Sequence, residues 1–356
     1  MLYVYNIAVS YNTVQSERIA MTRKSITTFA AAFVLATAAV LVFSTFQAQE
    51  EKQDTPHGSV GRQEEGESLA QSFFIESMRQ RSYGEGSVDI EKLIEDNVAF
   101  RSYVVSYQSD GLKLFALMNV PKMQRPESGF PVVIVNHGYI NPQTYSTTRS
   151  YKTITDFYAR NGFVVLKPDY RGHADSETGN TSAINRINYA VDVLNLLAII
   201  DTIADVDPEK IAMYGHSMGG EITLRVLEIS DQVKAATLWA SAATTFPENM
   251  LYFIRRHRPE IAEQIEREIH EVFREQDYEK LSSIDNVELI STPLILHHGT
   301  RDGSVPFDWS EELSERLTDA GVSHMFYPYD GENHNFTRGS WSTVVNLDLE
   351  LFKNYL

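Results

Sequence analysis

The chain has 356 residues, of which 43% are hydrophobic, so it is long and apolar enough for one large domain or two modest ones with a buried core. Forty-eight acidic residues against 31 basic ones give a formal net charge of -17, which disfavours binding to nucleic acid and to anionic membrane surfaces. The sequence contains no cysteine, which excludes disulfides, thiolate metal sites and a cysteine nucleophile.

The N-terminal part of the chain is typical of an export signal or a membrane anchor. Residues 25–46 form an uncharged, largely apolar run directly after a basic pair. We expect residues 1–48 to act as a signal peptide, or as an anchor that contacts the membrane if it is not cleaved, with 1–20 a candidate upstream extension before Met21. The basic pair predicts that the rest of the chain crosses the cytoplasmic membrane and is periplasmic, extracellular or membrane-anchored.

A polar linker is predicted to precede the folded domain. Residues 49–68 are charged and nearly free of large apolar side chains, which is typical of a disordered segment. The remaining 69–356 open with an amphipathic helical pattern at 69–82 and a second short helical stretch at 87–96. We therefore expect one folded domain over 69–356.

Strand-like runs follow these two helical patterns. Two runs flank the Ser-Asp-Gly turn at 109–111 and predict an antiparallel hairpin. Short, mostly apolar runs separated by helical segments come next, as expected for parallel strands buried on both faces. These runs are PVVIVNH, FVVLKPD, KIAMYG, KAATLWA, TPLILHH and SHMFYPY. The fold class is therefore α/β, an open and mostly parallel sheet flanked by helices, in which ligands bind beyond the carboxyl ends of the strands.

A candidate nucleophile lies at the end of the third of these runs. KIAMYG leads through Gly215 and His216 to Ser217, Met218 and Gly219, and EITLRVLEI then has helical spacing. A strand, a tight turn and a helix are the context of a serine nucleophile, because small residues at both ends permit a strained turn that lifts the hydroxyl above the sheet edge. A serine hydroxyl is a poor nucleophile until a base removes its proton, so a histidine and an orienting carboxylate are required as well.

Candidates for the acid and the base follow the last two runs. Asp302 lies on the loop after TPLILHH, and His334 lies on the loop after SHMFYPY. The order Ser217, Asp302, His334 is the order found in α/β hydrolases. Two carboxylates that could compete with Asp302, Asp330 and Glu332, lie in the same turn as the histidine. The histidines that could compete with His334 are His173, His297, His298 and His324.

Two backbone N–H groups are candidates for an oxyanion site. Tyr139 follows the strand-like run PVVIV in NHGYIN, and Met218 follows the nucleophile. We expect both N–H groups to point at the same place, where they would stabilise the charge that develops in the transition state.

From about residue 100 onward the sequence resembles the catalytic domain of the prolyl oligopeptidase family, within the α/β-hydrolase superfamily. The matching segments are VVIVNHG, FVVLKPDYRG, VDPEKIAMYGHSMGG, TPLILHHGTRDGSVP and YDGENHNF. The resemblance implies a serine hydrolase in which Ser217 attacks an acyl carbon, His334 transfers the proton and Asp302 holds the imidazole, with an acyl-enzyme that is then hydrolysed.

The departures from that family favour an ester as the substrate. Classical peptidases of the family carry a β-propeller before the catalytic domain, and the segment between the linker and the first strand is too short for one. Tyr139 stands where the family's loop has a second glycine, and His137 does not match the tyrosine donor that some members place at the oxyanion site. Stand-alone domains of this kind resemble bacterial carboxylesterases, so we expect a carboxylic ester hydrolase. A peptidase acting on small peptides or aminoacyl amides is the alternative.

Other residues near the predicted strand ends are candidates for substrate contact. These are His137, Arg171 and His216, although a hydrogen-bonded structural loop is the stronger interpretation for Arg171. The helical, highly charged insertion 247–290 is predicted to form a small lid. Glu221 either complements the N-terminus of its helix or faces the floor of the pocket.

No metal site and no cofactor are predicted, because histidines and carboxylates are scattered without ligand-like spacing. The expected partner is a small ester or a short peptide as substrate, and nucleic acid is not expected to bind.

Overall fold

The computed structural model describes residues 69–179 and 186–356. The signal or anchor predicted at 1–48 and the linker predicted at 49–68 lie outside the described residues. Within the described part, no helix combines the length and the apolar character that crossing a membrane requires. Export and anchoring therefore stay predictions.

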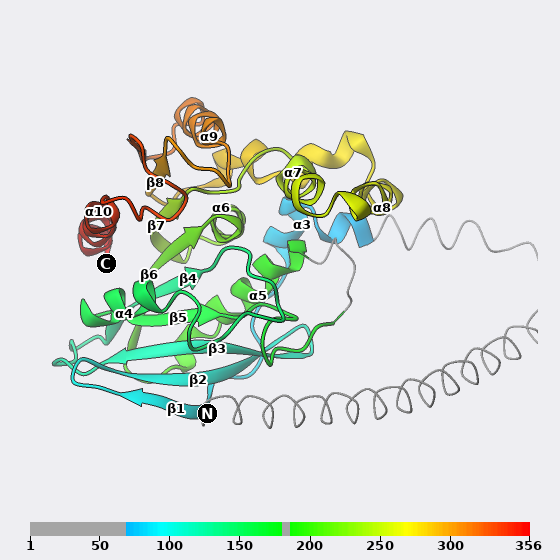
Figure 1. The fold of residues 1–356 in the computed structure, drawn as a ribbon. Coiled ribbons are helices and arrows are strands. Elements are labelled where there is room, and N and C mark those ends of the chain that lie inside the picture. Colours follow the sequence, from blue (N-terminus) through cyan, green and yellow to red (C-terminus); the bar gives the residue numbers. More distant parts are fainter. Residues whose placement is uncertain (1–68, 180–185) are drawn as a thin grey trace, which may run out of the picture. The chain divides into compact units, whose positions relative to one another are not determined.

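A nine-stranded sheet forms the centre of the described domain (Figure 1). Its order is β1-β2-β3-β5-β4-β6-β7-β8-β9; the pairs from β5 to β9 are parallel, and those that link β1, β2, β3 and β5 are antiparallel. The strands are β1 (Asp89–Asp96), β2 (Phe100–Ser109), β3 (Leu112–Pro121), β4 (Phe130–Asn136), β5 (Val164–Pro168), β6 (Val206–His216), β7 (Val233–Trp239), β8 (Leu294–Gly299) and β9 (His324–Tyr329).

The parallel strands coincide with the six apolar runs expected from the sequence. β5 and β8 are buried at every position, and β4 and β7 at all positions but one. Helices on both faces of the sheet account for this burial and for the lack of a polar alternation. The prediction of an α/β fold with an open, mostly parallel sheet is confirmed.

The predicted hairpin at 109–111 is formed by β2 and β3. Ser109 pairs with Leu112, so that Asp110 and Gly111 make a two-residue loop in which both residues have positive φ, 52° and 75°. Two positive φ values are the mark of a type I′ turn, which matches the twist of the flanking strands and favours Asp-Gly. The hairpin prediction is confirmed for this reason.

The helical stretch predicted at 87–96 is wrong, because Asp89–Asp96 form the edge strand β1. β1 pairs antiparallel with β2 through a register with two irregularities, and nearly all of its side chains are exposed. A helix here would have had no buried face to hold it. Hydrogen bonding to the free edge of β2 therefore overrides the helical pattern.

Helices cover both faces of the sheet and enclose two apolar cores. α3, α5, α6 and α9 pack over the first core, and α4 and α10 pack over the second. The helices are α3 (Ile75–Gln80), α4 (Lys152–Arg160), α5 (Asn188–Leu197), α6 (Met218–Ile229), α9 (Phe307–Asp319) and α10 (Trp341–Tyr355), with a 3-10 helix at Ile200–Thr202. This packing fixes the strands whose ends carry the predicted site.

The insertion at 247–290 consists of helices, as the sequence predicts. It forms α7 (Glu248–His257), α8 (Pro259–Val272) and 3-10 helices at Glu275–Lys280, Ser283–Asp285 and Val287–Leu289. In Figure 1, α7 and α8 lie beside the N-terminal helical segment that contains α3. Phe273 joins these parts, since its ring contacts Phe73 from the N-terminal segment and Phe246 at the start of the insertion, with centroids 5.9 and 5.4 Å away.

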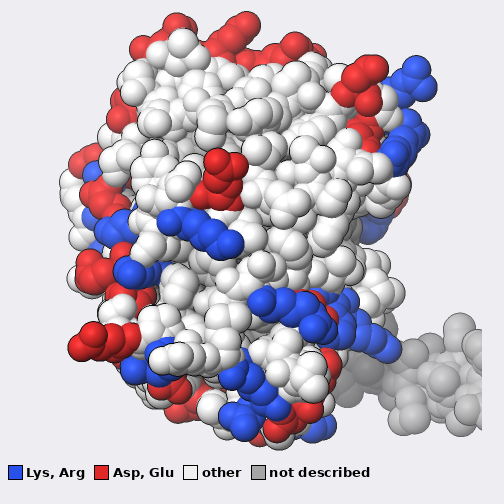
Figure 2. All heavy atoms as spheres, turned by 90° about the vertical axis from the view of Figure 1, so that its left-hand side faces the viewer, with Lys and Arg blue, Asp and Glu red and all other residues white. Residues whose placement is uncertain are grey.

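Charged side chains of both signs lie close together on the face drawn in Figure 2, around areas that carry no charge. Two ion pairs of the insertion are of this exposed kind: Arg255 pairs with Glu248 and Glu266, and each of these side chains is at least 40% exposed. Such pairs stabilise a fold by about 1 kcal/mol at most, so the apolar cores and buried polar contacts hold the domain together.

Asp348 is a fully buried polar contact that ties α10 to the sheet. One carboxylate oxygen accepts hydrogen bonds from Thr237 Oγ1 at 2.6 Å and from His297 Nε2 at 3.0 Å. The other accepts from Tyr158 Oη at 2.9 Å and Trp239 Nε1 at 3.0 Å. Four donors from three secondary-structure elements, α4, β7 and β8, thus converge on one side chain.

We expect Asp348→Ala to lower the free energy of unfolding by about 3 kcal/mol or more, because it leaves buried donors without acceptors. Chemical denaturation measures this value. Glu350→Ala on the same helix removes an exposed carboxylate and is the matched control, with an expected change within about 0.5 kcal/mol. Equal effects of the two substitutions would contradict the role given to Asp348.

Candidate active site

Ser217 lies on the turn between β6 and α6 in a backbone conformation that only glycine adopts readily. Its φ is 57° and its ψ is -122°, and holding a non-glycine residue there costs about 1–3 kcal/mol. Backbone hydrogen bonds secure it: its N–H donates to the carbonyl of Trp239 at 2.9 Å, and its own carbonyl accepts from Gly220 at 2.9 Å and from Ala242 at 3.0 Å. The strand–turn–helix context expected for a nucleophile is present.

The glycines on either side of Ser217 provide room for a close approach of backbones. A Cβ atom on Gly219 would lie 2.0 Å from the carbonyl oxygen of Asn136, and one on Gly215 would lie 2.4 Å from the carbonyl oxygen of Gly219. Neither glycine has positive φ. The strain of the turn therefore falls on Ser217, and the glycines let the turn pack against the end of β4.

His334 and Asp302 are brought together by the loops after β9 and β8. His334 Nδ1 lies 2.7 Å from Asp302 Oδ2. Since a carboxylate only accepts, Nδ1 carries the proton and Nε2 is free to act as a base. The same carboxylate oxygen accepts from His298 Nε2 at 3.0 Å. Within the described residues the Ser217 hydroxyl makes no hydrogen bond, which is common before substrate binds.

The carboxylate of Asp302 is held in its ionised form. Burial alone would raise the pKa of Asp302, but hydrogen bonds from His298 and His334 outweigh burial and hold the pKa well below its usual range. The N–H groups of Ser304 and Val305 donate to the other oxygen at 2.7 and 3.1 Å. A carboxylate that is ionised and fixed in place can orient the imidazole of a neighbouring histidine.

His216, predicted to contact substrate, instead joins three loops of the site. Its Nε2 lies 3.0 Å from the carbonyl of His334, and its Nδ1 lies 2.5 Å from the Tyr151 hydroxyl. That hydroxyl also accepts from the N–H of Gly138 at 2.8 Å. Burial, followed by the proximity of His334, lowers the pKa of His216 to about 3, so its ring is neutral at neutral pH. The partners fix its tautomer, with Nε2 donating and Nδ1 accepting.

The loop after β4 runs directly beside Ser217. A Cβ atom on Gly138 would lie 3.0 Å from Ser217 Cβ, which places the next residue, Tyr139, at the mouth of the site with its side chain 64% exposed. Met218 is the first residue of α6, where N–H groups have no carbonyl to bond within the helix. One predicted oxyanion residue thus follows a residue that touches Ser217, and the other follows Ser217 itself along the chain; their role as oxyanion donors stays a prediction.

His137 is buried below this loop. Its ring stacks between those of Tyr145 and Tyr170, at centroid distances of 4.5 and 4.3 Å, and Nδ1 lies 2.8 Å from the carbonyl of Gly138. Burial lowers the pKa of His137 well below its usual range. His137 therefore holds the loop in place by stacking and hydrogen bonding, and its fully buried side chain is not exposed to a substrate.

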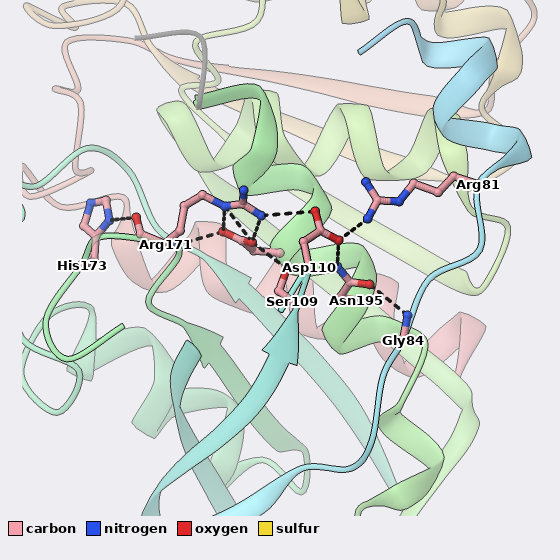
Figure 3. A network of polar contacts seen from close by, with 8 residues as sticks. Arg81, Gly84, Ser109, Asp110, Arg171, His173 and Asn195 are labelled. Atoms are coloured by element: carbon pink, nitrogen blue, oxygen red, sulfur yellow. Dashed lines mark hydrogen bonds and ion pairs between the residues drawn. The ribbon is translucent and has the colours of Figure 1, made fainter. Parts of the chain in front are cut away.

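Arg171, the third residue predicted to contact substrate, faces the interior. Its Nη2 and Nε lie 2.6 and 3.0 Å from Asp192 Oδ1, and Asp110 is 3.8 Å away. Figure 3 shows this network continuing to Arg81 and Gly84 in the N-terminal segment. These contacts agree with the interpretation that Arg171 belongs to a hydrogen-bonded structural loop.

Two residues of the site had no individual signal in the sequence. Tyr151 is one of many tyrosines, and the sequence indicates His298 only as a competitor for the base. Both act on other residues through contacts between loops that lie far apart in the chain.

No group of histidines and carboxylates within the described residues has the geometry of a metal site.

Known proteins match most of the described domain. The model of the prolyl oligopeptidase family matches residues 149–353, more than half of the chain. YtmA, an uncharacterized peptidase of Bacillus subtilis, is 24% identical over 260 residues, which cover 71% of this chain and 94% of YtmA. Dipeptidyl peptidase 4 of Felis catus is 23% identical over 279 residues, which cover 70% of this chain and 33% of that protein.

Solved structures show the same fold at low sequence identity. Dipeptidyl peptidase 4 of Porphyromonas gingivalis has a TM-score of 0.60 at 21% identity, over 74% of this chain and 38% of that one. An acetyl xylan esterase from Paenibacillus sp. R4 has a TM-score of 0.60 at 17% identity, over 87% of this chain and 99% of that one. The matches to the two dipeptidyl peptidases thus cover only 33% and 38% of the length of those proteins. Residues 69–179 and 186–356 form one sheet with its helices and include no β-propeller.

We expect Tyr151→Phe to lower kcat for p-nitrophenyl acetate about tenfold, equivalent to about 1.4 kcal/mol, because Gly138 and His216 lose their shared partner. Steady-state kinetics measure this change, and KM should move less than kcat. Tyr158→Phe is the matched control, since it also removes a buried tyrosine hydrogen bond but lies away from the site. If both variants lose stability and kcat alike, the hydroxyl of Tyr151 has no positioning role.

Proposed function

Because the chain belongs to the prolyl oligopeptidase family and is a serine hydrolase, we propose that Ser217, His334 and Asp302 are its catalytic triad and that it hydrolyses carboxylic esters. The observation that carries the triad is the 2.7 Å hydrogen bond between His334 Nδ1 and Asp302 Oδ2. The carbonyl of His334 also accepts a hydrogen bond from the ring of His216, the residue before Ser217. This contact ties the loop of the proposed base to the turn of the proposed nucleophile.

The proposed reaction has two halves. His334 Nε2 takes the proton of the Ser217 hydroxyl as Oγ attacks the ester carbon, and the carbonyl oxygen becomes an oxyanion that the N–H groups of Tyr139 and Met218 stabilise. The tetrahedral intermediate collapses when His334 returns the proton to the leaving alcohol. Water then attacks the acyl-enzyme as His334 Nε2 takes its proton. His334 gives this proton to Ser217 Oγ as the bond between Oγ and the acyl carbon breaks, and the acid product is released. Asp302 keeps the imidazole in the tautomer that both halves need.

The extent of the fold supports an ester as the substrate. The described domain corresponds to nearly the whole of an acetyl xylan esterase, whereas much of each dipeptidyl peptidase has no counterpart in the described residues. The space next to Met218, the residue after Ser217, is also small on the side of the insertion, which suits a short acyl group better than a peptide residue.

Cleavage of small peptides or aminoacyl amides is the second candidate function. It is supported by YtmA, which is named as a peptidase and which this chain matches over 94% of its length. The triad chemistry is the same for both, and they differ in the leaving group and in what the pocket accepts.

We expect a fluorophosphonate probe to label the wild-type protein and to leave Ser217→Ala unlabelled, because only an activated serine attacks phosphorus. Gel fluorescence measures the labelling. Ser230→Ala, at the other end of α6, is the control and should label like the wild type. Labelling of Ser217→Ala at the wild-type level would exclude Ser217 as the nucleophile.

We expect kcat/KM for p-nitrophenyl acetate to exceed that for alanine p-nitroanilide by at least about a hundredfold, equivalent to about 2.7 kcal/mol in the barrier. The release of p-nitrophenol and p-nitroaniline, followed side by side, gives this ratio. Comparable rates on the two substrates would favour the peptidase function.

A further inference from the structure

A small pocket with both charged and apolar lining residues lies beside Met218, on the side of the insertion. Its floor includes Glu221 and Arg225 of α6, and its walls include Ala242, Phe246 and Met250. Its free volume is about 10 Å³, close to the space that one water molecule needs. The pocket therefore accepts only a very small group in this conformation.

The floor of the pocket is a nearly buried pair of opposite charges. Arg225 Nη2 lies 3.5 Å from Glu221 Oε1, and the two side chains are 2% and 17% exposed. The same Nη2 donates to the carbonyl of Leu281, which holds the guanidinium in place. Glu221 thus lines this pocket and also stands in the first turn of α6, so both placements that the sequence left open are met.

Two buried polar atoms in the lining residues lack hydrogen-bond partners within the described part of the chain. They are Arg225 Nη1 and Asn249 Oδ1, a donor and an acceptor. Both atoms are already buried from solvent, so the residues around this pocket hold hydrogen-bonding groups that an alkyl chain could not satisfy.

The position of the pocket relative to Ser217 determines which half of an ester enters it. The pocket is lined by Met218, the residue after Ser217, whereas the ring of His334 packs against that of His216, the residue before it, with centroids 4.5 Å apart. His334 must reach the leaving oxygen to return its proton, so the leaving alcohol lies on the His216 side. The acyl substituent then points toward the pocket.

We propose that this pocket binds the acyl group of the substrate and that the Glu221–Arg225 pair, together with the wall from the insertion, restricts it to short acyl groups of about the size of acetyl. The proposal rests on the ester hydrolysis proposed above and specifies the substrate class. The pair limits the acyl chain in two ways, by filling the space and by presenting charge to an apolar tail.

The test is the chain-length profile of kcat/KM on p-nitrophenyl acetate, butyrate and hexanoate. In the wild type we expect kcat/KM to fall about tenfold or more with each extension of the acyl chain, because a methylene that does not fit a rigid pocket lowers kcat/KM by about this factor. Glu221→Ala should raise the butyrate-to-acetate ratio about tenfold by opening the floor. Glu221→Gln keeps the volume and removes the charge, and should change the ratio less.

A second route to a larger pocket does not disturb the ion pair. Met250→Ala shortens the opposite wall and should also raise the butyrate-to-acetate ratio. Leu251→Ala, the neighbouring buried residue of α7 that does not line the pocket, is the matched control and should leave the ratio unchanged. Thermal unfolding shows that each variant is folded.

The outcomes separate the two proposals. Equal turnover of acetate and hexanoate by the wild type would overturn the short-acyl pocket and leave ester hydrolysis intact. So would folded Glu221→Ala and Met250→Ala proteins with the wild-type ratio. A wild type that reacts with the fluorophosphonate probe but hydrolyses none of the three esters would overturn both proposals.

Discussion

The left-handed backbone at Ser217 is the constraint on which the site depends. A φ of 57° is unfavourable for serine, and it persists because both ends of the residue are hydrogen-bonded to strand ends and loops that cannot move independently. Close packing adds to this, since Gly219 has no room for a side chain against the carbonyl of Asn136. The turn at the end of β6 thus holds Ser217 at the edge of the sheet that also carries the loops after β8 and β9.

His216 extends this rigidity to the other loops of the site. Its neutral ring connects the carbonyl of His334 to Tyr151 and, through the tyrosine hydroxyl, to Gly138 in the proposed oxyanion loop. Three segments that are distant in the chain therefore share one hydrogen-bonded path. A neutral imidazole suits this function, because protonation would replace the acceptor at Nδ1 with a second donor. Positioning of the proposed base and of the proposed oxyanion donors is coupled in this way to the turn at Ser217.

Local sequence patterns predicted most of the fold and pointed to the residues of the proposed triad, and contacts between distant segments explain what the patterns missed. The buried parallel strands and the Asp-Gly hairpin follow from apolar runs and turn chemistry that act over a few residues. The helix expected at 87–96 failed because pairing with β2 decided the conformation. His298 and Tyr151 gained their places only from tertiary contacts with Asp302 and His216, which no local pattern contains.

The central claim is that Ser217 carries a covalent acyl group during turnover, and mass spectrometry of the trapped intermediate tests it most directly. The wild-type protein is mixed with p-nitrophenyl acetate, quenched in acid during the first turnovers and digested. The geometry predicts one added acetyl group on the peptide that contains Ser217, formed together with a burst of p-nitrophenol. Turnover without any acetylated peptide, or acetylation at another residue that also disappears during turnover, would contradict it.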